Sequence, residues 1–182
     1  MKKLIFLIIL FPLTAFIQEK ELPKLSVEQY EILNKLFPKE ASFTLLRYTS
    51  FPLHLDYFLT KEHFEMDGGF CRLTNDPFEK SDLWDHLDSE DFEYIKDNIS
   101  LLGEAYELEQ GKLIYPNVQL VDLYLNNHIH LISAPIIKGR FSIIHHVHSF
   151  IEKIIFFEKD ENGDWDILCE VYIKLDLVDF GH

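Results

Sequence analysis

The C-terminal part of the chain contains the stretch that decides the fold, residues 165–176, which read WDILCEVYIKLD. Every odd position from Trp165 to Leu175 is apolar, and most of the even positions carry a charge. Successive side chains of a strand point to opposite faces, so this alternation predicts a half-buried strand of an antiparallel sheet. Asn162 and Gly163 lie just before it and accept positive φ, which favours a type I′ hairpin with the preceding segment.

Further strand-like segments fill the C-terminal half, whereas helical patterns occur nearer the N-terminus. The expected strands span residues 42–50, 112–115, 120–125, 128–135, 141–150, 152–159 and 165–176. Two helices are expected, one over 26–37 with Ser26 as its N-cap and one over 89–99 with Ser89 as its N-cap. Residues 51–80 have no sustained period and predict loops with short strands. The sequence therefore predicts an α+β fold, with N-terminal helices packed on a C-terminal antiparallel β-meander.

The N-terminus has the pattern of an export signal. Two lysines precede an apolar run over residues 4–17, which is shorter than the roughly 20 residues that a membrane-spanning helix needs. We expect a signal peptide over 1–17, a linker over 18–25 and a single domain over 26–182, with no stable membrane span in the mature chain. This places the protein in the periplasm or outside the cell. Ile17 occupies a place where cleavage prefers a small residue, so an uncleaved anchor is the alternative.

The composition is strongly acidic. The 182 residues include 17 Lys and Arg against 31 Asp and Glu, a formal net charge of −14. Such a chain lacks the cations that neutralise phosphates, which argues against binding to nucleic acid or anionic lipid. The chain has two cysteines, Cys71 and Cys169. In an oxidising compartment they could form a disulfide; the alternative is that Cys169 is a buried thiol on the inner face of its strand.

Histidines give the clearest chemical lead. His128 and His130 share one face of an expected strand, and His146 and His148 share one face of the next. If the register places the two pairs on the same side of the sheet, these four residues are candidate ligands for Zn²⁺, Cu²⁺ or Ni²⁺. A register shifted by one residue would separate the pairs, leaving polar residues on a solvated face. A milder form of the hypothesis is that acidification below about pH 6 charges clustered histidines, which then repel one another and loosen the hairpin.

Other chemical motifs are weak. Residues 160–166 place oxygen-bearing side chains at alternating positions, as calcium loops do, but the expected Gly at the sixth position is Trp165 and the expected Glu at the twelfth is Val171. A hairpin turn is therefore the better interpretation. The sequence has no Gly-x-Ser-x-Gly, His-Glu-x-x-His or glycine-rich phosphate loop. No catalytic residue or cofactor other than zinc is indicated, and the balance favours a protein that is not an enzyme.

Three segments together resemble a known family. They are SEDFEYIK at 89–96, ISAPI at 132–136 and FFEKDENGDWDI at 156–167. Their order resembles that of small secreted proteins of the Bacteroidetes, a family without an assigned activity, over roughly residues 89–172. Many members carry a Gly- and Cys-rich stretch where this chain has HHVHSF at 145–150, so no role of those cysteines transfers. The resemblance implies export into a bacterial envelope and supplies no catalytic residue.

These patterns predict a non-enzymatic binding or interaction domain of the bacterial envelope. The expected ligand is a protein or a small molecule. A metal-binding protein or metal-dependent hydrolase built on the strand histidines is one alternative. An acidic inhibitor or immunity-type partner of a basic protein is the other, because complementary charge accelerates association.

Overall fold

The computed structural model describes residues 22–49, 70–72, 80–82, 88–98, 105–126, 128–149 and 151–173. The predicted signal peptide and most of the segment 51–80 lie outside these residues. The elements are α1 (Val27–Leu33), β1 (Ser42–Leu46), β2 (Phe70–Arg72), β3 (Lys80–Asp82), α4 (Ser89–Asp97), a 3-10 turn (Gln110–Lys112), β4 (Asn117–Val121), β5 (Ile129–Ile132), β6 (Ile136–Lys138), β7 (Phe141–His148), β8 (Ile151–Lys159) and β9 (Trp165–Ile173). None of the helices in the described ranges is long and apolar enough to cross a membrane.

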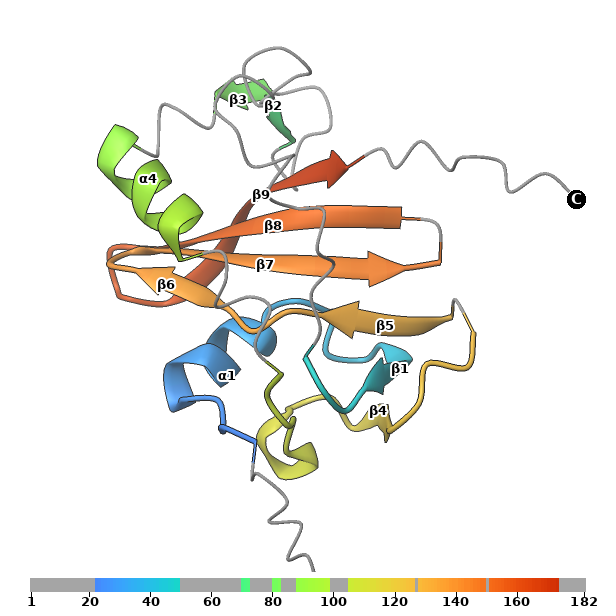
Figure 1. Ribbon diagram of the computed structural model, residues 1–182. Helices are drawn as coiled ribbons and strands as arrows, with labels where there is room; N and C mark the ends of the chain where they lie inside the picture. The colour runs from blue at the N-terminus through green and yellow to red at the C-terminus, as the bar shows by residue number, and fades with distance from the viewer. Residues whose placement is uncertain are drawn as a thin grey trace, which may run out of the picture.

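The strands form one mixed sheet in the order β3-β2-β9-β8-β7-β5-β1-β4, and β6 pairs with the start of β7 (Figure 1). The consecutive strands β7, β8 and β9 are antiparallel neighbours, as predicted. The other end of the sheet differs, because β1 inserts between β4 and β5 and runs parallel to both. A mostly antiparallel sheet with few helices fits the predicted α+β class. The parallel pairs were not predicted, because alternation identifies a strand but not its partner.

Helix α1 is shorter than predicted. Its capping box is present, with the Ser26 hydroxyl accepting from the Gln29 N–H and the Gln29 side chain accepting from the Ser26 N–H. The helix ends at Leu33, with Asn34 as its C-cap. The Asn34 side chain donates to the Lys112 carbonyl at 3.0 Å and accepts from the Ile114 N–H at 3.1 Å. These side-chain contacts explain why residues 112–115 do not form the predicted strand.

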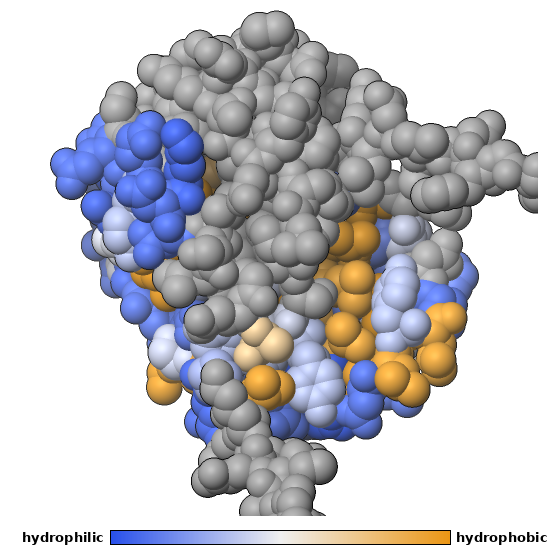
Figure 2. All heavy atoms as spheres, viewed as in Figure 1, coloured by the Kyte–Doolittle hydropathy of each residue, from blue (hydrophilic) through white to orange (hydrophobic). Residues whose placement is uncertain are grey.

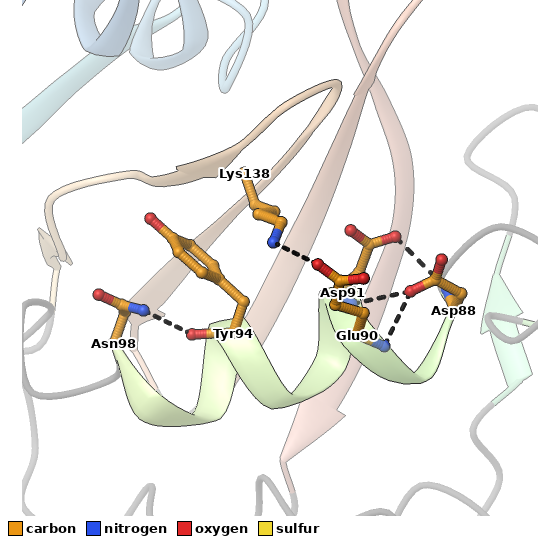
Figure 3. Close-up of polar contacts among 6 residues, drawn as sticks. All are labelled: Asp88, Glu90, Asp91, Tyr94, Asn98 and Lys138. Carbon is orange, nitrogen blue, oxygen red and sulfur yellow. Dashed lines mark hydrogen bonds and ion pairs between the residues drawn. The ribbon is translucent and has the colours of Figure 1, made fainter.

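Helix α4 begins one residue earlier than predicted. Its N-cap is Asp88 rather than Ser89, because the Asp88 carboxylate accepts from two first-turn amides at 2.8 and 2.9 Å. Lys138 of β6 holds the helix against the sheet, with its ammonium 4.5 Å from the centre of the Tyr94 ring (Figure 3). The same ammonium lies 3.6 Å from the Glu90 carboxylate. The helix is thus attached to the sheet by a cation–π contact and an ion pair.

Strand β9 contains a β-bulge that its sequence pattern did not predict. Phe156 of β8 lies opposite Cys169, whereas Phe157 lies opposite Ile167, so Leu168 is an extra residue on β9. An extra residue reverses the faces to which the following side chains point. The odd positions of β9 therefore divide between both faces, and the prediction of a strand buried on one side only is wrong.

Both faces of the central strands contain buried apolar residues. On the face that we call the α1 face, one cluster joins helix and strand residues: Tyr30, Ile32, Leu33, Ile132, Ile144, Ile155, Phe157 and Trp165. On the opposite face, buried residues are Ile143, Ile154, Phe156 and Cys169. Cys169 is fully buried and disulfide-bonded, and the chain contains one other cysteine, Cys71. The predicted disulfide is therefore confirmed, and the alternative of a free buried thiol at Cys169 is wrong.

The β8–β9 connection is a hairpin, but not of the predicted type. Gly163 has a φ of 87°, and among the described residues Ser149 is the one non-glycine with positive φ, so Asn162 lacks the conformation that a type I′ turn requires. Instead, the Asp160 carboxylate accepts from the N–H groups of Asn162 and Asp164, both at 2.8 Å. These bonds lower the pKa of Asp160, the Asp164 amide contributing most.

An exposed apolar segment follows β4, which is the last strand at its end of the sheet. Leu123 and Leu125 are 66% and 78% exposed, and Tyr124 between them is also exposed. Figure 2 shows apolar side chains on this side of the surface. Nothing in the described part of the chain covers them.

Candidate functional site

The register of β5 and β7 decides where the candidate histidines lie. Leu131 is opposite Val147 and Ile132 is opposite His146, so paired positions are either both even or both odd. Continued by two residues, this register places His130 opposite His148. His130, His146 and His148 therefore share the α1 face, which is the arrangement that the metal hypothesis needs. We call these three residues the histidine cluster.

The rings of the histidine cluster are in direct contact. The ring centres of His130 and His148 are 3.8 Å apart and those of His130 and His146 are 5.1 Å apart, and both pairs are parallel within 4°. His130 Nδ1 lies 2.9 Å from His146 Nε2, a hydrogen bond in which one neutral ring donates to the other. Two neighbouring nitrogens thus already point toward each other across the strand pair.

Aromatic rings and burial keep His130 and His146 uncharged. Phe37 meets the His130 ring edge-on at 5.0 Å and the His146 ring at 5.5 Å. Burial, aided by the positive charge of Lys153, lowers the pKa of His146 to about 2. Burial and then the neighbouring His148 and Lys153 lower the pKa of His130 to about 4. Both imidazoles are therefore neutral at neutral pH.

The fourth candidate, His128, does not join the cluster. It lies in a turn before β5 begins, its side chain is exposed, and its backbone N–H donates to the Asn126 side chain at 2.9 Å. In the described ranges, no three His, Cys, Asp or Glu side chains are arranged to hold a metal ion. Stacked rings direct their nitrogens within parallel planes, whereas ligands of one ion converge on a point. Metal binding by the cluster stays a prediction.

A charged pair that sequence reasoning missed continues the cluster across the sheet. Lys153 lies opposite His146 on β8, and its ammonium contacts the Glu170 carboxylate of β9 at 2.6 Å. The Tyr172 hydroxyl donates to the other Glu170 oxygen at 3.1 Å. Lys153 lies opposite Tyr172 and Glu170 opposite Ile155, so the two charges are diagonal neighbours, and alternation within one strand does not reveal such a pair.

The fifth histidine of this region lies on the opposite face. His145 Nε2 is 2.7 Å from a Glu152 carboxylate oxygen, and the two side chains are 1% and 3% exposed. A neutral or charged imidazole can donate to this carboxylate, which satisfies a buried polar group. At such burial the pair is part of the core and is inaccessible to a substrate.

A groove of about 430 Å³ lies between α1 and the β8–β9 turn. Its lining includes Glu31, Lys35 and Lys39 from α1 and the residues after it, and Gly163, Asp164 and Trp165 from the turn and β9. Trp165 is 2% exposed, and its indole N–H has no hydrogen-bond partner in the described chain. The Lys159 ammonium lies 4.8 Å from the centre of the Trp165 ring. The groove thus combines charges of both signs with a buried donor that lacks an acceptor.

The fold and these two sites define a class of protein: an α+β domain with a mixed sheet, a histidine cluster on one face and a charged groove beside its first helix. No protein family, curated protein or solved structure matches the chain. The functional conclusions below therefore depend on the geometry of the chain itself.

Proposed function

We propose that this protein is a non-enzymatic binding domain that acts outside the cytoplasm and takes a small ligand in the groove beside α1. In this proposal the N-terminal helices pack on the sheet, and α1 forms one wall of the groove. The location follows from the lysines and apolar run at the N-terminus. A volume of about 430 Å³ lies within the range of small-molecule pockets, about 300 to 1,000 Å³.

The observation that carries the proposal is the lining of the groove, which places charged side chains of both signs around Trp165. The indole N–H of Trp165 has no acceptor in the described chain, but this atom is buried and does not by itself offer a contact to a ligand.

The charges of the groove indicate the class of ligand. Lys35 and Lys39 can bind a carboxylate, and Glu31 and Asp164 can bind an ammonium group. Because both signs are present, we propose a small zwitterion, such as an amino acid or a short peptide end. Binding is favoured over catalysis because the described histidine–carboxylate pair, His145 and Glu152, is buried away from solvent.

The test is a thermal-unfolding screen of the full chain against free amino acids, dipeptides and dicarboxylates. We expect a zwitterion to raise the unfolding temperature, and Lys39→Ala and Asp164→Asn each to reduce the shift. Lys96→Ala on α4 is the matched control, since it removes an exposed lysine that does not line the groove. The proposal is wrong if no compound of the panel stabilises the protein, or if both groove variants respond like the unmodified chain.

The net charge of −14 favours a second candidate, an acidic partner of a basic protein. Complementary charge accelerates encounter, and salt screens it. This candidate predicts capture of a basic protein from an envelope extract at low salt and its release as salt is raised. Capture that is insensitive to salt would contradict it.

A further inference from the structure

We propose that His130, His146 and His148 form a transition-metal site, independent of the groove, in which the His148 ring turns out of its stack to complete three-nitrogen coordination of Zn²⁺. The site is built on two neighbouring strands of the sheet. Two ligands come from alternate positions of β7 and one from β5, so all three side chains leave the same face. Paired strands hold opposite Cβ atoms about 5 Å apart, which is within reach of a common ion.

Two of the three proposed ligands already have nitrogens close together. His130 Nδ1 and His146 Nε2 are 2.9 Å apart. Zinc–nitrogen bonds of about 2.0 to 2.1 Å at a tetrahedral angle separate two ligand nitrogens by about 3.3 Å. Zinc binding would require the donor ring to carry its proton on its other nitrogen, the two nitrogens to separate by a few tenths of an ångström, and both rings to turn so that their lone pairs meet at the ion.

The third ligand requires one rotation. The His148 ring is stacked on His130 with the centres 3.8 Å apart, and the described chain has no three ligands that already converge. His148 is only partly buried and lies at the end of β7, so its ring can turn about its side-chain bonds without displacing the core. After this rotation its nitrogen joins the other two, and the fourth zinc position stays open to water.

One charged pair lies beside the cluster, and two aromatic rings cover it. Lys153 would repel a bound cation, but the Glu170 carboxylate at 2.6 Å from the Lys153 ammonium offsets this charge. Phe37 and Phe43 pack edge-on against the His130 ring and exclude water from that side. Low water access strengthens the attraction between the ion and its ligands.

The experiment is a zinc titration of the chelator-treated full chain by calorimetry, with Co²⁺ absorption as a probe of coordination geometry. We expect one ion per chain and the intense visible bands of tetrahedral Co²⁺. His148→Ala should weaken zinc binding by about tenfold or more, because one of three ligands is lost. His128→Ala is the matched control, since it removes an exposed histidine from the same region, and should leave binding unchanged.

The outcomes also separate this site from the groove. Lys39→Ala and Asp164→Asn should bind zinc like the unmodified chain, whether or not the groove binds a zwitterion. Because His148 is partly exposed, we expect its variant to fold, which the unfolding temperature without metal checks. Zinc binding that is undetectable, that survives His148→Ala, or that is lost in His128→Ala would overturn the proposal.

Discussion

The two buried imidazoles make the stability of the metal-free protein sensitive to mild acid. Burial lowers the pKa of His130 to about 4 and that of His146 to about 2, whereas the ordinary value is 6.5. Between pH 6.5 and pH 4 the unfolded chain binds protons that the folded chain does not. The stability that depends on these rings is therefore complete above pH 6.5 and falls as the pH is lowered.

The size of the loss at pH 5 follows from these values. One pKa unit corresponds to about 1.4 kcal/mol, and pH 5 lies about 1.5 units below the ordinary histidine value. Each ring that stays neutral in the folded chain therefore lowers the free energy of unfolding at pH 5 by about 2 kcal/mol. At pH 5 the two rings contribute equally, because both folded-state values lie below this pH. We expect a total loss of about 2 to 4 kcal/mol, since the rings touch and their shifts are coupled.

The assay is urea unfolding at pH 7 and at pH 5 in a buffer with chelator, followed by tryptophan fluorescence. His146→Leu removes one of the two imidazoles, so the difference between the two pH values should shrink by about 2 kcal/mol. His128→Gln, the control, should keep the full difference because its side chain is exposed. Equal stability of the unmodified protein at both pH values, or an unchanged difference in His146→Leu, would refute the reasoning.

Three further predictions concern the fold. Ser149, at a φ of 57° in the β7–β8 turn, lies in a region that asparagine tolerates better, so Ser149→Asn should stabilise by up to about 1 kcal/mol and raise the urea midpoint; a lower midpoint would contradict this. Reduction of the Cys169 disulfide should cost about 4 kcal/mol and increase the intact mass by two hydrogens, whereas an unchanged mass would exclude the bond. The buried Tyr115 hydroxyl donates to a carbonyl at 2.8 Å and accepts from an amide at 3.1 Å. Tyr115→Phe should therefore lower the free energy of unfolding by about 1 to 3 kcal/mol. Burial raises the pKa of this hydroxyl to about 12, so Tyr115→Phe should leave the ultraviolet titration of the tyrosines unchanged below pH 11. Loss of a titration step below pH 11 in this variant would contradict the burial of the hydroxyl.

Local patterns were sufficient for the strands of the C-terminal half. Alternation predicts β7, β8 and β9, and their short connections make them antiparallel neighbours. The position of β1 could not be predicted in the same way. Its partners, β4 and β5, lie more than 70 residues later, and a parallel pair is fixed by packing between distant segments rather than by a turn. The prediction of a strand over 112–115 was wrong for a related reason, because the distant residue Asn34 bonds to the backbone of this segment.

The histidine cluster illustrates the same limit at a single site. The sequence identified His130, His146 and His148 as residues that could share a face. Whether they do depends on the register between β5 and β7, which only the pairing of these strands provides. Lys153 and Glu170 were missed because neither is unusual until β8 and β9 place them side by side. The residue types therefore indicated the kind of site, and the strand pairing determined which of the residues lie together.

The bulge at Leu168 explains how one alternating stretch can serve both faces of the sheet. Without an extra residue, Trp165 and Cys169 would point to the same side, because both occupy odd positions. With it, Trp165 joins the α1 cluster beside the groove, and Cys169 lies on the opposite face, where its disulfide forms. The apolar positions that predicted one buried face are therefore needed on two, and the groove exists beside α1 because the register changes before the strand reaches Cys169.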